Sequence, residues 1–163
     1  MKLRILTDAD EAALLDLLTS DRIKQTYMLP DFDRREDAIP LARRLTQLSR
    51  EDHRYLRGME QDGILVGYLN EVEVQGDSVE LGYLVHPDHW NKGFATAALK
   101  LAIEDQFRRG FREVICGAFE CNPTSLRVME KAGMALLERV DEIEYRGKTH
   151  RCLYRSIQAA DRR

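Results

Sequence analysis

The chain is poor in cysteine, proline and aromatic residues, and these shortages exclude several classes of protein. Its 163 residues include three cysteines, four prolines and one tryptophan. Cys116, Cys121 and Cys152 are an odd number without C-x-x-C spacing, which indicates neither a disulfide framework nor a zinc site. We therefore expect structural thiols in a reducing compartment and no metal.

Long apolar runs and a strong net charge are also missing. The N-terminal stretch MKLRILTDADEAALLDLL carries acids where a signal peptide would be basic, and no apolar run reaches membrane-spanning length. The net charge is -3, with 25 basic and 28 acidic residues interspersed, which does not suggest a nucleic-acid or anionic-membrane surface. We expect a cytoplasmic protein, a monomer or homodimer, with neither nucleic acid nor membrane as a partner.

The apolar content that is present is enough for one core. The chain is 44% hydrophobic and 33% charged, and this length and composition are typical of one soluble globular domain, here residues 1–163. No internal repeat, low-complexity stretch or linker interrupts it.

The first part of the chain is expected to begin with a short strand, KLRIL, and to continue into a helix capped by Thr7 or Asp8. An irregular link, IKQTYMLPDFD, follows. Asp33 and Glu36 then form a pair resembling a capping box ahead of AIPLARRLTQL, and Pro40 predicts that this helix starts late or bends.

From residue 55 the apolar period changes to that of strands. RYLRGMEQ, ILVGYLNEVEV and SVELGYLV predict an antiparallel meander, joined by turns at Asp62-Gly63 and at 75–77. A helix over 94–109, the strand REVICGAF, a helix capped by Asn122 and a hairpin around Arg146-Gly147 complete the chain. Strand, crossover helix and strand form a βαβ unit whose strands should be parallel. The fold class is therefore α+β, with a mixed, mostly antiparallel sheet and helices on its faces.

The segment HPDHWNKGFATAALK joins a strand to a helix through a polar turn. The N-terminus of a helix leaves N–H groups unpaired and carries partial positive charge, which suits a phosphate. Gly93 would let a ligand approach the backbone, the alanines after it keep that surface open, and Lys92 adds a positive charge. The competing interpretation is a simple connection in which Gly93 serves only the turn.

Two phosphate-binding motifs fail on this segment, and a third fits. The P-loop and the dinucleotide fingerprint both require glycines that are absent here. WNKGFA, residues 90–95, resembles the R/Q-x-x-G-x-G/A motif of the GNAT superfamily of acyl-CoA-dependent N-acetyltransferases, with Trp90 in place of Arg or Gln. GYLVHPDHWNKGFAT is similar to the ribosomal-protein N-terminal (alanine) acetyltransferase branch. Downstream, NPTSLRVMEKAGM resembles the family segment N-x-x-S-x-x-x-x-E-K-x-G-F.

The resemblance implies a GNAT-like fold with a central splayed parallel strand pair, helices on both faces of the sheet, and acetyl-CoA as cosubstrate without a metal. The amides from Asn91 to Thr96 would hold the pyrophosphate, and Asn122 would touch the pantetheine arm besides capping its helix. The full set of implied cofactor-binding residues is Tyr83, Leu84, Val85, Trp90, Asn91, Lys92, Gly93, Phe94, Ala95, Thr96, Asn122 and Ser125.

The implied reaction is attack of an amine on a thioester in a ternary complex, which requires a neutral amine. At pH 7 this costs about 4 kcal/mol for a pKa of about 10, and about a third as much for an N-terminal α-amine. Glu80 is the candidate base, with Glu120 and His86 as alternatives, and a solvated or ion-paired Glu80 is the competing interpretation. On a regular strand Glu80 and Tyr83 lie on opposite faces, so a bulge would be needed to aim the carboxylate.

The sequence leaves two interpretations of how the leaving thiolate is protonated. Met129 stands where many members of the family have a tyrosine, which leaves Ser125 as the best remaining hydroxyl. Ser125 is equally well explained as a helix-start serine, and a thiolate with a pKa of about 8.5 can leave unassisted.

The acceptor is expected to be a protein N-terminus, a small amine such as a polyamine, or an aminoglycoside. Tyr27, Asp31, Phe32 and Asp33 are candidates to line its pocket, with Tyr27 and Phe32 otherwise explained as packing residues. Two competing hypotheses are a non-catalytic acyl-CoA sensor and a domain that binds another nucleotide.

Overall fold

The computed structural model describes residues 1–161 and divides the chain into two compact units. The first consists of Met1–Asn70 and Tyr83–Phe94, and the second of Glu71–Gly82 together with the residues from Ala95 onward. The chain passes between the units inside two strands and at the start of one helix. That residues 1–163 act as one domain stays a prediction.

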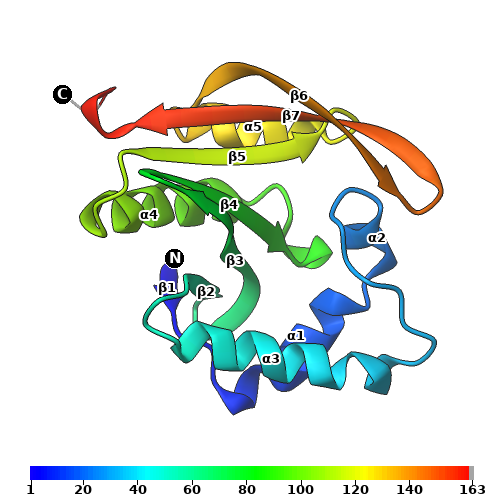
Figure 1. Ribbon diagram of the computed structural model, residues 1–163. Helices are drawn as coiled ribbons and strands as arrows, with labels where there is room; N and C mark the ends of the chain where they lie inside the picture. Colours follow the sequence, from blue (N-terminus) through cyan, green and yellow to red (C-terminus); the bar gives the residue numbers. More distant parts are fainter. Residues whose placement is uncertain (162–163) are drawn as a thin grey trace. The chain divides into compact units, whose positions relative to one another are not determined.

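The first unit contains β1 (Lys2–Arg4), α1 (Glu11–Leu18), α2 (Asp21–Lys24), α3 (Ile39–Arg50), β2 (Leu56–Gln61) and the first part of β3 (Ile64–Gln75). β2 pairs antiparallel with both β1 and β3. In Figure 1, α1 (blue) lies beside α3 (cyan), and the two helices are in contact. Their apolar faces share one core with residues of the strands, including Leu14, Leu18, Leu56 and Tyr68.

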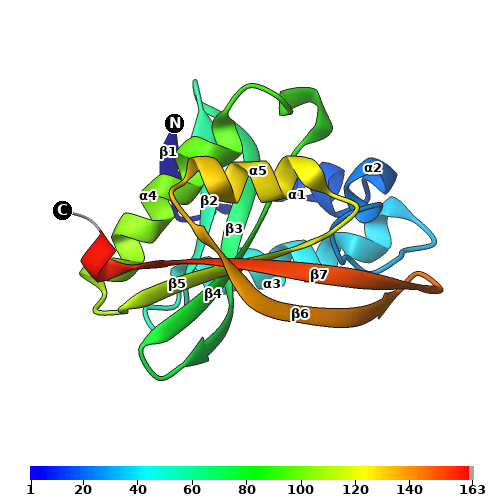
Figure 2. The same ribbon diagram turned by 90° about the horizontal axis from the view of Figure 1, so that it is seen from above.

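The second unit contains most of β4 (Ser78–Val85), nearly all of α4 (Phe94–Arg108), and β5 (Glu113–Phe119), α5 (Pro123–Lys131), β6 (Ala135–Tyr145) and β7 (Lys148–Gln158). β4 and β5 run parallel, with a register from Ser78↔Glu113 to Leu81↔Cys116, whereas β7 pairs antiparallel with both β5 and β6. Figure 2 shows α5 (yellow) lying along β5 and β7, which it contacts. The strand order is β1-β2-β3-β4-β5-β7-β6, so the predicted mixed, mostly antiparallel α+β fold is confirmed.

Most predicted caps and turns are confirmed. Asp62-Gly63 and Arg146-Gly147 both have positive φ at both residues, as a two-residue type I′ hairpin turn requires. The Asn122 side chain caps α5. Thr7 caps a short 3₁₀ turn that leads into α1, and its backbone N–H donates to the Asp10 carboxylate at 2.8 Å.

One prediction about the segment between α1 and α3 is wrong, and a second holds for all but the first two residues of the link. The capping pair is not Asp33 with Glu36. Instead, the Asp37 carboxylate accepts from the backbone N–H of Arg34 at 3.1 Å and forms an ion pair with its guanidinium at 2.9 Å, so the turn begins one residue later. The helix α2, capped by Ser20, runs into the link that was expected to be irregular. Its four residues are too few for a periodic pattern to reveal.

β3 and the end of β4 approach each other very closely at Gly67. A Cβ atom on Gly67 would lie 2.2 Å from the carbonyl oxygen of Leu84 and 3.0 Å from the Cα of Val85. Both neighbours are backbone atoms and cannot rotate away. Glycine is therefore required at residue 67 by space rather than by backbone conformation.

We predict that Gly67→Ala lowers the free energy of unfolding by about 2 kcal/mol or more, because the added methyl group pushes two strands apart. Urea denaturation measures the change. Gly63→Asn is a suitable control, since residue 63 has φ of +80°, which asparagine tolerates, and a Cβ there meets nothing within 4 Å. Equal stability of the two variants would contradict the steric argument.

Candidate functional site

The turn that follows β4 is closed by its own hydrogen bonds. Pro87–His89 form a single 3₁₀ turn, in which the His89 N–H donates to the His86 carbonyl at 2.9 Å and the Trp90 N–H donates to the Pro87 carbonyl at 3.2 Å. The His86 Nδ1 accepts from the backbone N–H of Asp88 at 3.2 Å. His86 therefore serves as the cap of this turn.

Trp90 ties the turn back to the end of β4. Its indole Nε1–H donates to the Val85 carbonyl at 2.7 Å, and the Arg22 guanidinium of α2 lies 4.8 Å from its ring centroid, within the range of a cation–π interaction. The indole of Trp90, one of the predicted cofactor-binding residues, is thus engaged in holding the turn in shape.

Beyond Trp90 the backbone takes an unusual conformation that leads into α4. Asn91 has φ of +60° and Gly93 has φ of +77°, both in the left-handed region, and a Cβ on Gly93 would meet nothing within 4 Å. The Lys92 Nζ donates to the Asp88 carbonyl at 2.9 Å, which folds the lysine back onto the turn.

α4 follows this turn directly and is 15 residues long, with no acidic side chain in its first turn. Asn91, Lys92 and Gly93 are exposed, whereas Phe94 to Ala97 are half-buried. Short side chains, open backbone and the positive end of a helix dipole make this segment suited to an anion such as a phosphate.

The end of β4 holds Tyr83, Leu84 and Val85, which are expected to bind acetyl-CoA through their backbone. Leu84 and Val85 are buried and Tyr83 is half-buried. The His86 N–H donates to the Val66 carbonyl of β3 at 2.8 Å, which anchors this end of the strand. One lone pair of the Val85 carbonyl is taken by the Trp90 indole.

The N-terminus of α5 carries Asn122 and Ser125. The Asn122 Oδ1 accepts from the backbone N–H of Ser125 at 3.1 Å, so Asn122 is a helix cap, while its contact with the pantetheine arm stays a prediction. Ser125 is half-buried. Met129, which stands where the family resemblance implies a tyrosine in many members, is fully buried.

Glu80 is half-buried on β4, in an ion pair whose partner the sequence did not indicate. Arg139 of β6 places its Nη1 3.5 Å from the Glu80 Oε2. Burial raises the pKa of the Glu80 carboxyl above its usual range, and Arg139 opposes this rise. The register of β4 with β5 is regular at Glu80↔Ile115, so no bulge redirects this side chain. Its role as a base stays a prediction.

The alternative bases have partners of their own. Glu120 is exposed and pairs with Arg151 at 3.1 Å. Besides its capping contact, the His86 Nδ1 lies 3.7 Å from the Asp88 carboxylate. Glu80, by contrast, is half-buried, and burial raises the pKa of its carboxyl.

The segment expected to line the acceptor pocket contains a buried cation supplied by the chain itself. The Lys24 side chain is 5% exposed, and its Nζ lies 3.3 Å from Asp31 and 5.4 Å from the ring centroid of Phe32. The Tyr27 hydroxyl lies 3.5 Å from the Asn70 Oδ1. Asp31 and Phe32 therefore engage Lys24, and a single lysine in a polar link gave no signal of this in the sequence.

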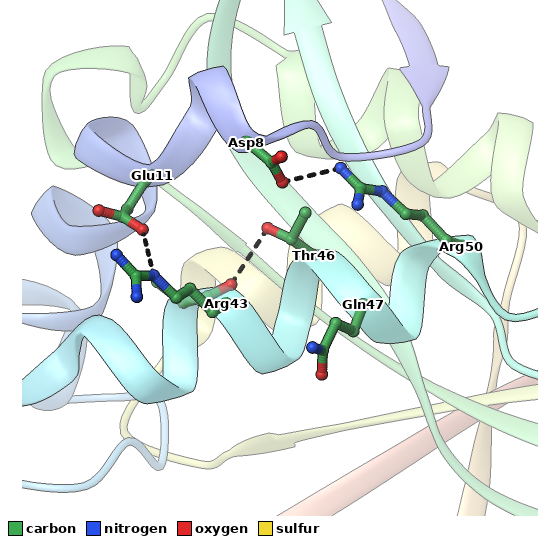
Figure 3. Close-up of a pocket in the computed structure, with 7 residues that line it drawn as sticks. Asp8, Glu11, Arg43, Thr46, Gln47 and Arg50 are labelled. Atoms are coloured by element: carbon green, nitrogen blue, oxygen red, sulfur yellow. Dashed lines mark hydrogen bonds and ion pairs between the residues drawn. The ribbon is translucent and has the colours of Figure 1, made fainter.

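A cavity of about 370 Å³ lies apart from all these residues within the first unit, between α3 and the start of α1 (Figure 3). Its charges are paired, with Arg43 to Glu11 and Arg50 to Asp8, each at 2.8 Å. None of the predicted site residues lines it. It is a surface hollow between ion-paired side chains.

Among residues 1–161, no group of three or more His, Cys, Asp or Glu side chains is placed to hold a metal ion. None of the helices in that range is long and apolar enough to cross a membrane.

Comparison with known proteins defines the class. The family model of the acetyltransferase (GNAT) domain matches residues 1–135. The chain therefore belongs to the GNAT acetyltransferase family, and it is an acetyl-CoA-dependent N-acetyltransferase.

The individual proteins that resemble this chain have low sequence identity to it. The chain is 26% identical over 136 residues to the uncharacterized N-acetyltransferase YoaA of Bacillus subtilis, covering 80% of this chain and 77% of that protein. Spermidine N-acetyltransferase from Vibrio cholerae, in complex with CoA and spermine, has a TM-score of 0.81 at 17% identity, covering 98% of this chain and 95% of that one. Ribosomal-protein-alanine N-acetyltransferase from Brucella melitensis has a TM-score of 0.76 at 19% identity, covering 97% and 99%. At these identities the two structures support the fold.

We predict that Trp90→Phe lowers the free energy of unfolding by about 1 kcal/mol, because the ring is kept but the Val85 carbonyl loses its donor. Arg22→Met is the matched control, since it removes the cation above the ring and keeps the hydrogen bond. Its cost should be about 0.5 kcal/mol or less at this exposed position. Chemical denaturation of both variants measures the difference, and the reverse ranking would refute the importance of the hydrogen bond.

Proposed function

We propose that this N-acetyltransferase moves the acetyl group from acetyl-CoA to a primary amine by direct transfer in a ternary complex, and that the α-amine of a protein N-terminus is the first acceptor to test. The observation that carries the proposal is the turn from Trp90 to Thr96. Left-handed residues at 91 and 93 lead there into a helix without acids in its first turn.

In this proposal the amides from Asn91 to Thr96 bind the pyrophosphate. The anion is matched by backbone N–H groups and by the helix dipole rather than by a fixed cation, since Lys92 donates to the Asp88 carbonyl. Because Trp90 and His86 already hold the turn, little conformational entropy remains to be lost when the anion binds.

The backbone of Tyr83, Leu84 and Val85 is proposed to pair with the pantetheine arm as an added strand would, and Asn122 to contact the arm from α5. Bound acetyl-CoA supplies an activated acyl thioester. The Tyr83 N–H is assigned the task of stabilising negative charge on the acyl oxygen, as a backbone donor held in place before the reaction.

Glu80 is proposed to accept the proton of the attacking ammonium. A carboxyl whose pKa is raised by burial is a better proton acceptor near neutral pH than an ordinary surface glutamate. An N-terminal α-amine, with a pKa of about 8, is easier for such a base to deprotonate than an amine with a pKa of about 10.

Ser125 is proposed as the hydroxyl that protonates the leaving thiolate. The buried Met129 gives no proton donor at the position where many relatives use a tyrosine. A thiolate with a pKa of about 8.5 can also depart without an acid, so the reaction tolerates the loss of this group.

Two observations favour a protein N-terminus over a polyamine. The segment ending at Thr96 resembles the branch that acetylates ribosomal-protein N-termini, with tryptophan at position 90. Lys24, the last residue of α2, forms an ion pair with Asp31 and lies against Phe32 in the link that follows, which removes one carboxylate and one aromatic ring that a polycation would need.

The second candidate function is a non-catalytic acyl-CoA sensor. The missing tyrosine at residue 129 and the ion pair of Glu80 with Arg139 both favour it. Such a protein would bind acetyl-CoA through the same turn and transfer nothing.

The deciding experiment is a turnover screen with acetyl-CoA against alanyl, seryl and methionyl N-terminal peptides, spermidine and kanamycin, read as thiol release. We expect turnover on at least one peptide. Saturating acetyl-CoA, at about 100 times its Kd, should stabilise the protein by about 2.7 kcal/mol and raise Tm by about 5 °C or more. Binding without turnover on any amine would favour the sensor, and no change in Tm would refute acetyl-CoA binding.

We predict that Gly93→Val weakens acetyl-CoA binding at least tenfold in calorimetry, because a branched side chain at φ of +77° strains the turn and covers its amides. Gly110→Val is the matched control. It imposes similar strain at φ of +99° on the other end of α4 and should leave the affinity unchanged. Equal affinity of the two variants would overturn the role of the turn.

A further inference from the structure

Arg139 lies at the centre of a cluster of polar side chains on one face of the second unit. Its guanidinium carbon lies 3.8 Å from the ring centroid of Tyr154, its Nη2 lies 2.8 Å from the Asp141 carboxylate, and its Nη1 lies 3.5 Å from Glu80. Three partners on three strands hold one side chain. None of the motifs in the sequence assigned Arg139 a role.

An irregularity in β6 brings Arg139 to this face. From Leu136 to Val140 the strand β6 advances four residues, whereas its partner β7 advances two, from Arg155 to Leu153. The extra residues form a bulge, and Arg139 lies within it, directly before Val140. A bulge that re-aims a side chain beside a candidate base is a common device near active sites.

Charges from several elements surround the Glu80 carboxylate. Glu73 of β3 and Asp141 of β6 raise its pKa, whereas Arg139 lowers it, and burial has the largest effect of all. Burial raises the pKa of the Cys116 and Cys152 thiols, and the nearby Glu80 charge adds to that rise. Within this cluster Arg139 is the cation that compensates for the buried negative charge.

We propose that Arg139 is the positioning residue for Glu80: braced on the Tyr154 ring and on Asp141, it holds the Glu80 carboxylate in one orientation and keeps it ready to accept a proton. This inference rests on the proposed function of Glu80 as the base. It adds a residue that touches neither acceptor nor acetyl-CoA and acts through the carboxylate.

If the ion pair between Arg139 and Glu80 had only a structural role, it would contribute little to the stability of the protein. Arg139 is 42% exposed, and ion pairs at such exposed positions contribute little to stability. Its effect on Glu80 is larger because that carboxylate is 16% exposed and desolvated. A structural role and a positioning role therefore differ in what they change: the former changes stability slightly, and the latter changes the pH at which Glu80 loses its proton.

The sign of the expected change follows from these causes. Without Arg139, burial and the repulsion from Glu73 and Asp141 act unopposed, so the Glu80 pKa rises further. A base must be deprotonated to work. The acidic limb of the pH–rate profile should therefore move to higher pH.

The first test needs no acceptor. Side-chain carboxyl NMR of the full-length protein, with Glu80→Gln identifying the signal, follows the titration of Glu80. We expect Arg139→Met to raise the midpoint by about one pH unit, and Arg139→Lys to restore most of the difference. Arg112→Met is the control, since it removes the same charge from an exposed pair with Asp77 and should leave Glu80 unchanged. An unchanged midpoint in Arg139→Met would overturn the proposal.

The second test separates this proposal from the function of Glu80. The kcat/KM of each variant is measured against pH with the alanyl peptide and with spermidine. If Glu80→Gln removes the acidic limb and Arg139→Met moves it by about one unit, with about tenfold loss below the limb, both proposals are supported. If Glu80→Gln leaves the profile intact, Glu80 is not the base. If Glu80→Gln removes the limb while Arg139→Met leaves it in place, only the positioning role fails.

Discussion

Strand β4 is the constraint on which the rest of the structure depends. Its first half forms the parallel pairing with β5, its last residues lie against Gly67 with no room for a side chain there, and its end is fixed by the Trp90 indole. The eight residues of β4 thus take part in a strand pairing, in a close backbone contact and in the anchoring of a turn. Glu80 lies in the first half of the same strand, where β4 pairs with β5.

The turn after β4 and the cluster around Glu80 use opposite strategies. The turn binds its own side chains to neutral backbone carbonyls, as Lys92 does with Asp88, and leaves open backbone at residues 91–93. Around Glu80, charged groups compensate one another in a half-buried setting, where each has a large effect on the others. The first arrangement suits binding of an anion, and the second suits control of a proton.

Local signals in the sequence predicted most of the fold and the family. The hairpin turns at Asp62-Gly63 and Arg146-Gly147, the Asn122 cap and the βαβ unit each depend on neighbouring residues, and all were confirmed. The capping pair before α3 was displaced by one residue because Arg34 adds an ion pair to the bond from Asp37. Arg139 beside Glu80 could not be predicted, because the two are distant in the sequence and the bulge that joins them leaves no pattern.

The bulge in β6 also has a bearing on how this protein can vary. Between the pairs Leu136↔Arg155 and Val140↔Leu153, three residues on β6 face one on β7, so the excess is two, an even number. Since side chains alternate with a period of two, the hairpin keeps the same faces on either side of the bulge. A deletion of two residues from this segment would therefore leave the faces of the strand unchanged, whereas a deletion of one residue would invert them.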